Sequence, residues 1–169
     1  MRLFKLLLKV SFGKNYRKKF KLKYSCDIPK IEEYEKLGTL FPHPVGIVIS
    51  KLVTMGNNCI IFQNVTLGAG KNIPSHPDQD CYPVLGDNVI VFAGAVVAGK
   101  IRIGNNVIIG ANSFVNKTIP DNAIVAGIPA KVVGENRSTE LRKPFPTRVP
   151  TTSFGSTHQA GISNKIDAP

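Results

Sequence analysis

Histidine is the side chain best suited to acid–base chemistry near neutral pH, because its unperturbed pKa is about 6.5. This chain holds three histidines: His43, His76 and His158. His43 lies between Pro42 and Pro44, which restrict the backbone on both sides of the imidazole. An imidazole held in this way can take a proton from a reacting group as a general base. A capped or buried structural histidine is the alternative interpretation.

The cysteines favour neither a disulfide framework nor a metal site. Cys26, Cys59 and Cys81 form no C-x-x-C pair and have no histidine partner at zinc-finger spacing. We therefore expect no bound metal and a reducing compartment, the cytoplasm. The chain also lacks a G-x-x-x-x-G-K-[ST] sequence and a G-x-G-x-x-G sequence, so neither nucleotide hydrolysis nor a dinucleotide cofactor is predicted.

A six-residue repeat runs through the middle of the chain and must position these side chains. One column of the repeat holds ten aliphatic residues at ten sampled positions: Ile49, Met55, Ile61, Leu67, Leu85, Val91, Val97, Ile103, Ile109 and Val115. A period of six does not fit an α-helix of 3.6 residues per turn. It fits short strands with a corner after each, and the steps GNN, GDN and GNN at 56–58, 86–88 and 104–106 supply corners where φ is free to become positive. The prediction is an all-β fold, a parallel β-helix stabilised by stacking of its coils.

The repeat is interrupted once, between Leu67 and Leu85, by the sequence GAGKNIPSHPDQDCYPV. The pattern resumes in the same column, so a loop is expected to leave the regular coil here. Long loops on a regular scaffold often carry function, and we expect this one to cover a site. A tolerated insertion without function is the alternative.

The sequences IGNNVIIGANSFV, IPDNAIVAGIPAKVVG, HPVGIVI and NVTLGAG resemble the hexapeptide-repeat acyltransferases, in particular their serine acetyltransferase-like branch, whose short members O-acetylate polysaccharides. The resemblance covers about residues 27–134. It implies a left-handed parallel β-helix, an acetyl-CoA-dependent O-acetyltransferase activity and a homotrimer with sites between subunits.

The resemblance also implies roles for individual residues. His43 matches the histidine of the family motif H-x-x-G-I-V, which takes the proton of the acceptor hydroxyl as it attacks the thioester of acetyl-CoA. Asp27, in the sequence CDIPK, is the candidate carboxylate that orients His43. A simple turn before Pro29 is the alternative role for Asp27. The candidate residues for binding acetyl-CoA are Ala93, Gly94, Ala111, Lys117, Gly127, Ile128, Pro129 and Lys131.

Three departures from serine acetyltransferases bear on the acceptor. Cys81, Tyr82 and Pro83 stand where the family has Arg-His-Pro, so the cation that would face a substrate carboxylate is missing. The family's large N-terminal helical domain and its C-terminal isoleucine are also absent from this sequence. We therefore expect a sugar hydroxyl of a surface polysaccharide or its precursor as acceptor, with serine O-acetylation in cysteine biosynthesis as the alternative.

The two ends of the chain differ from the repeat. Ten lysines and arginines but one acid lie in residues 1–30 of a chain whose net charge is +11. Residues 1–24 form a basic amphipathic segment suited to the inner face of an anionic membrane, or alternatively to packing on the β-helix. We expect a basic N-terminal segment at 1–26, the β-helix domain at 27–134 and a polar, disordered tail at 135–169.

Three other functions stay open on the sequence. A γ-type carbonic anhydrase shares the coil but needs three zinc histidines, and His158 lies in the tail. A non-catalytic, membrane-associated β-helix scaffold would not bind acetyl-CoA. A xenobiotic acetyltransferase would accept an antibiotic. Nucleic-acid binding is not expected, because no reading module is recognisable and aromatic residues are few.

Overall fold

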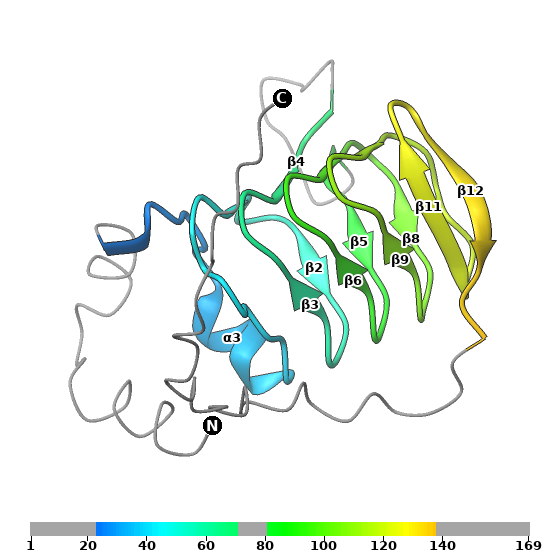
Figure 1. The fold of residues 1–169 in the computed structure, drawn as a ribbon. Coiled ribbons are helices and arrows are strands. Elements are labelled where there is room, and N and C mark those ends of the chain that lie inside the picture. The colour runs from blue at the N-terminus through cyan, green and yellow to red at the C-terminus, as the bar shows by residue number, and fades with distance from the viewer. Residues whose placement is uncertain (1–22, 71–80, 138–169) are drawn as a thin grey trace, which may run out of the picture.

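The computed structural model describes residues 23–70 and 81–137, which form a three-sided prism of stacked coils with one short helix at its beginning (Figure 1). Each strand is short, because a corner follows it after two to three residues in most coils. The elements are helix α3 (Ile31–Lys36) and strands β1 (Val48–Ile49), β2 (Thr54–Met55), β3 (Ile60–Ile61), β4 (Thr66–Gly68), β5 (Val84–Leu85), β6 (Ile90–Val91), β7 (Val96–Ala98), β8 (Arg102–Ile103), β9 (Ile108–Ile109), β10 (Phe114–Val115), β11 (Ala123–Gly127) and β12 (Ala130–Glu135).

The strands form three sheets, one on each face of the prism. Face A contains β1, β4, β7 and β10; face B contains β3, β6, β9, β11 and β12; and face C contains β2, β5 and β8. All pairs are parallel except β11 with β12, which form an antiparallel hairpin. The chain visits the faces in the order A, C, B, so each coil has an A–C, a C–B and a B–A corner.

The ten aliphatic residues of the repeat fill the inside of the prism, as the sequence predicts. The most exposed of them is Met55, at 7%. Val53, Cys59 and Val65, from the column four positions later, are fully buried. Stacking identical columns along the axis removes apolar side chains from water on all three faces, which no single coil can do.

The C–B corners explain the turn sequences of the repeat. The positive φ lies on the third residue of each step, at 56°, 58° and 57° for Asn58, Asn88 and Asn106, whereas the first residue is glycine for another reason. A Cβ on Gly86 would lie 2.5 Å from Oδ1 of Asn105 in the next coil. Asparagine tolerates the left-handed region, and glycine allows the close approach of the neighbouring coil.

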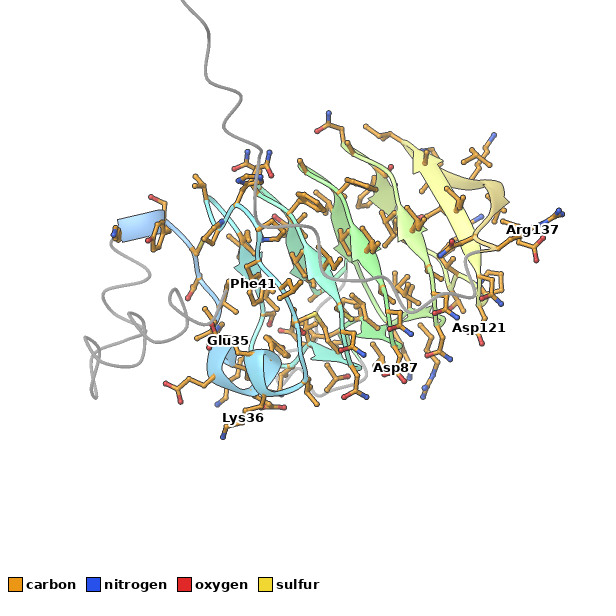
Figure 2. The ribbon with its side chains drawn as sticks, turned by 60° about the horizontal axis from the view of Figure 1, so that its bottom comes forward. Glu35, Lys36, Phe41, Asp87, Asp121 and Arg137 are labelled. Atoms are coloured by element: carbon orange, nitrogen blue, oxygen red, sulfur yellow. The ribbon has the colours of Figure 1, made fainter. Side chains whose placement is uncertain are left out.

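Polar side chains join one coil to the next along this same edge. The backbone N–H of Asn57 donates to Oδ1 of Asp87 at 2.6 Å, and that of Asn105 donates to Oδ1 of Asp121 at 2.8 Å. Figure 2 shows Asp87 and Asp121 following each other along the prism edge. These bonds satisfy corner amides that the strand ladders leave free.

Helix α3 closes the N-terminal end of the prism (Figure 1). Ile31 and Tyr34 are each 1% exposed, and the Tyr34 hydroxyl donates to the carbonyl of Val53 at 2.8 Å. Glu35 and Lys36 lie on its outer side (Figure 2). This helix is absent from the sequence-based expectation for residues 27–134.

Several expectations fall outside the described residues. They concern the basic segment up to residue 22, the loop residues 71–80 with His76, and the tail from residue 138 with His158. The three domain boundaries therefore stay predictions. Within 23–70 and 81–137, no helix has the length and apolar character needed to cross a bilayer.

Candidate functional site

His43 lies on the B–A corner of the first coil, in a turn that is longer than its counterpart below. Leu40 pairs with Ile60 on face B, and Val48 pairs with Thr66 on face A. Leu40 and Val48 are eight positions apart, whereas their partners are six apart. The two additional residues widen the turn, and Pro42, His43 and Val45 are exposed on it.

The imidazole of His43 is therefore on the surface, and the alternative of a buried core histidine is wrong. Its ring centroid is 6.4 Å from that of Phe62, tilted by 37°. Phe62 stacks in turn on Phe92 of the next coil, at 5.1 Å and 18°. The three rings make an aromatic row along the B–A corner, and Phe92 is 37% exposed.

Asp27 lies beside the turn that carries His43. Its backbone N–H donates to the carbonyl of Ile47 at 2.8 Å, and its carbonyl accepts from the N–H of Ile49 at 2.8 Å. Asp27 thereby extends face A by one position above β1, and its side chain is exposed like that of its partner Val48. The orienting role of its carboxylate toward His43 stays a prediction.

The B–A corner continues below His43 with small residues. Gly94 donates its N–H to the carbonyl of Gln63 at 3.0 Å, and the carbonyl of Ala93 accepts from Asn112 at 2.9 Å. These bonds stack Gln63, Ala93 and Ala111 in successive coils. Ala111 is exposed and Ala93 partly exposed on this edge, whereas the side chain of Asn112 occupies the space beside the Cα of Gly94.

The turn between β11 and β12 lies at the lower end of this edge. Gly127 donates its N–H to the hydroxyl of Ser113 at 3.2 Å, and Ile128 is 75% exposed. Pro129 follows through a cis peptide bond, and Lys131 on β12 is exposed opposite Ala126. The structure thus brings seven of the eight candidate donor-binding residues to one corner, together with His43.

Lys117 is the exception, because it follows β10 and lies on the A–C corner. The inserted loop also starts and ends there: Gly68 ends β4 on face A, and Val84 begins β5 on face C. Gly99 donates its N–H to the carbonyl of Gly68 at 3.1 Å at the base of this loop. Within one chain, the loop base and Lys117 are therefore on a different edge from His43.

Three residues of the site were not predicted. Phe62 and Phe92 interrupt a column that otherwise holds mainly glycine, alanine and other small residues, and that interruption was the available signal. Gln63 has a buried amide oxygen with no hydrogen-bond partner among the described residues. No sequence pattern marks Gln63.

The described residues hold no cluster of three or more histidine, cysteine or acidic side chains suited to a metal ion. His43 is also the one histidine within this part of the chain. The expectation that the protein binds no metal stays a prediction.

Comparison with known proteins shows which proteins this coil is similar to. Residues 82–117 match the family described as bacterial transferase hexapeptide (six repeats). A serine acetyltransferase of Staphylococcus aureus is 45% identical over 96 residues, which cover 56% of this chain and 42% of the relative. A serine acetyltransferase of Mycobacterium tuberculosis is 37% identical over 108 residues, covering 64% and 45%.

Solved structures agree with this comparison. The serine acetyltransferase of Neisseria gonorrhoeae superimposes with a TM-score of 0.55 at 37% identity, covering 60% of this chain and 38% of that chain. A serine acetyltransferase in complex with CoA gives 0.50 at 36% identity, covering 57% and 37%. The expected left-handed β-helix is confirmed, and the chain spans less than half the length of these relatives.

Proposed function

We infer that this chain, a hexapeptide-repeat transferase with serine acetyltransferase-like coils, is an acetyl-CoA-dependent O-acetyltransferase. One observation carries the proposal. The exposed imidazole of His43 lies at the head of the same corner that presents the small residues Ala93, Gly94 and Ala111. A base and an open edge for an extended thioester substrate are thereby combined on one line of the prism.

The reaction needs two proton transfers at the imidazole, one to it and one from it. His43 takes the proton of an acceptor hydroxyl while its oxygen attacks the acetyl carbonyl carbon of acetyl-CoA. The new ester C–O bond forms, the C–S bond breaks, and the imidazolium returns the proton to the leaving CoA sulfur. The exposed carboxylate of Asp27, beside the turn, is suited to stabilise the transient imidazolium.

The donor is proposed to lie along the B–A corner. Ala93 and Ala111 would let its pantetheine arm approach the main chain, and Lys131 would meet a phosphate at the lower end. The similarity to a serine acetyltransferase solved with CoA supports acetyl-CoA as the donor.

Two candidate functions differ in the acceptor of the acetyl group. The relatives named above are serine acetyltransferases, which favours L-serine over the sugar hydroxyl expected from the sequence. One observation favours a sugar. Cys81 stands at the position where a cation would be needed to pair with the carboxylate of serine. Serine is therefore the first candidate acceptor and a sugar hydroxyl the second.

We also propose a homotrimer in the cytoplasm, with the basic residues 1–24 toward the membrane. The loop base and Lys117 lie on the A–C corner, one edge away from His43. If the A–C corner of one subunit meets the B–A corner of the next, the loop and the lysine reach a site that a single chain leaves incomplete. Val48, 44% exposed on face A between these corners, suits such a contact.

A panel of acceptors tests the function. Release of the CoA thiol from acetyl-CoA is measured with L-serine, methyl glycosides, an aminoglycoside and no acceptor, and the acetylated product is identified by mass spectrometry. Transfer to a hydroxyl acceptor supports the proposal, and the acceptor with the highest kcat/KM decides between serine and sugar. Absence of both transfer and a thermal shift with acetyl-CoA would show a non-catalytic scaffold.

A further inference from the structure

We propose that Cys26 is a positioning residue, whose thiol fixes the turn that carries His43 against the segment that carries Asp27. The role of His43 as base belongs to the proposed function above, and this inference rests on it in part. Cys26 is 2% exposed, directly precedes Asp27 and lies far from His43 in the sequence.

The thiol contacts main-chain groups of residues that follow His43 in the sequence. Its Sγ lies 3.1 Å from the carbonyl oxygen of Pro44, to which the S–H donates, and accepts from the N–H of Ile47 at 3.4 Å. A third neighbour, the carbonyl oxygen of Tyr24, is 3.4 Å away. One side chain therefore engages a carbonyl immediately after His43 and an amide three residues further on.

These contacts stand where the regular ladder is interrupted. Gly46 donates its N–H to the carbonyl of Tyr24 at 3.1 Å, and Asp27 donates to the carbonyl of Ile47 at 2.8 Å. Between these bonds the wide turn departs from the strand, because it has two residues more than the corner below. At this place the thiol gives hydrogen-bond partners to the carbonyl oxygen of Pro44 and the N–H of Ile47.

The thiol is in the right protonation state for this task. Burial raises the pKa of Cys26, although the backbone amides of Ile47 and Gly46 lower it by a smaller amount. The group is thus a neutral S–H donor at neutral pH. Hydrogen bonds made by a thiol are weak. Loss of these hydrogen bonds is therefore expected to disturb the position of His43 more than the stability of the prism.

The decisive variants differ in whether the side chain keeps a hydrogen-bond donor and acceptor. Cys26→Val fills the site without a donor or acceptor, and Cys26→Ser retains both. Cys26→Ala also removes the donor and the acceptor, and its smaller side chain replaces valine in the test if Cys26→Val does not fold. Cys59→Val is the matched control, because Cys59 is also fully buried but its Sγ contacts the carbonyl of Gly86 at 3.4 Å on the C–B corner.

Two readouts are made on the full chain, after melting temperatures have shown that the variants fold. The first is kcat and KM for acetyl-CoA, with the best acceptor of the panel. The second is the imidazole signals in NMR spectra, where three histidines give an assignable set. Cys26→Val is expected to lower kcat by about 10- to 10²-fold with little change in KM, and to shift the His43 signals while those of His76 and His158 stay.

Cys26→Ser is expected to recover most of kcat, and Cys59→Val to leave kcat and the His43 signals unchanged. If Cys26→Val or Cys26→Ala retains the native kcat and the native His43 signals, the positioning role is refuted. If the native chain transfers no acetyl group, the proposed function fails, and the NMR signals still decide whether Cys26 holds His43 in place.

Discussion

Replacement of His43 by alanine is expected to remove catalysis without removing the fold. A general base typically contributes about 10²–10⁴-fold to a rate. At about 1.36 kcal/mol for each factor of ten, the variant loses roughly 2.7–5.5 kcal/mol of transition-state stabilisation. This loss is expected in kcat, with KM for acetyl-CoA nearly unchanged, because the donor is proposed to bind along the residues below His43.

The cost to stability is much smaller because the side chain is exposed. Among the described residues, the ring of His43 has one aromatic neighbour, Phe62, at a centroid distance of 6.4 Å. Such a pair is worth roughly 0.5–1.5 kcal/mol when well packed, and a surface position lies at the low end of this range. The melting temperature is therefore expected to fall by no more than roughly 4 °C.

The assay combines thiol release from acetyl-CoA with a thermal melt on the same preparation. His43→Gln serves as a second variant, because its amide keeps polarity but cannot take up a proton. Lys36→Ala, on the exposed side of α3 (Figure 2), serves as the control with unchanged activity. A His43→Ala variant with more than a tenth of the native kcat would refute the assignment of the base.

Two further predictions concern the coil and the aromatic row. Gly86→Ala is expected to destabilise the fold by about 1–3 kcal/mol, since its Cβ would lie 2.5 Å from Oδ1 of Asn105. Gly68→Ala should change stability by less than about 0.5 kcal/mol, because a Cβ there would meet no atom of the described residues within 4 Å. Equal effects of the two substitutions in denaturant unfolding would contradict the packing account. Phe92→Ala is expected to raise KM for donor or acceptor about tenfold, through loss of an exposed ring face that is separated from His43 by the ring of Phe62. An unchanged KM for both substrates would show that Phe92 binds neither.

The coil could be predicted because its signal is local and repeated. Ten aliphatic residues at a spacing of six define both the strands and the inward face, and the same pattern recurs in each coil. The assignment of turn roles was less complete. Asparagine carries the positive φ in the C–B corners, whereas glycine is required by the neighbouring coil, and this second reason becomes visible only when coils are stacked.

The candidate site was predictable in its residue types but not in its arrangement. His43 was identified by its motif, yet its exposure depends on a turn two residues wider than the corner below. Cys26 gave no signal in the sequence, because its contacts join segments 18 to 21 residues apart. His43, Ala93 and Ala111 lie on one corner because the coils stack on one another, and the order of residues in the sequence alone does not show this.

Helix α3 has a consequence for the solution behaviour of the protein. A β-helix ends in exposed backbone groups that a second prism could extend, as in a growing fibre. Ile31 and Tyr34 cover the first coil, and at the opposite end the antiparallel β12 stops parallel addition on face B. Within residues 23–70 and 81–137, α3 and β12 therefore cover the first coil and the lower end of face B, which hinders end-to-end stacking of two prisms at these places.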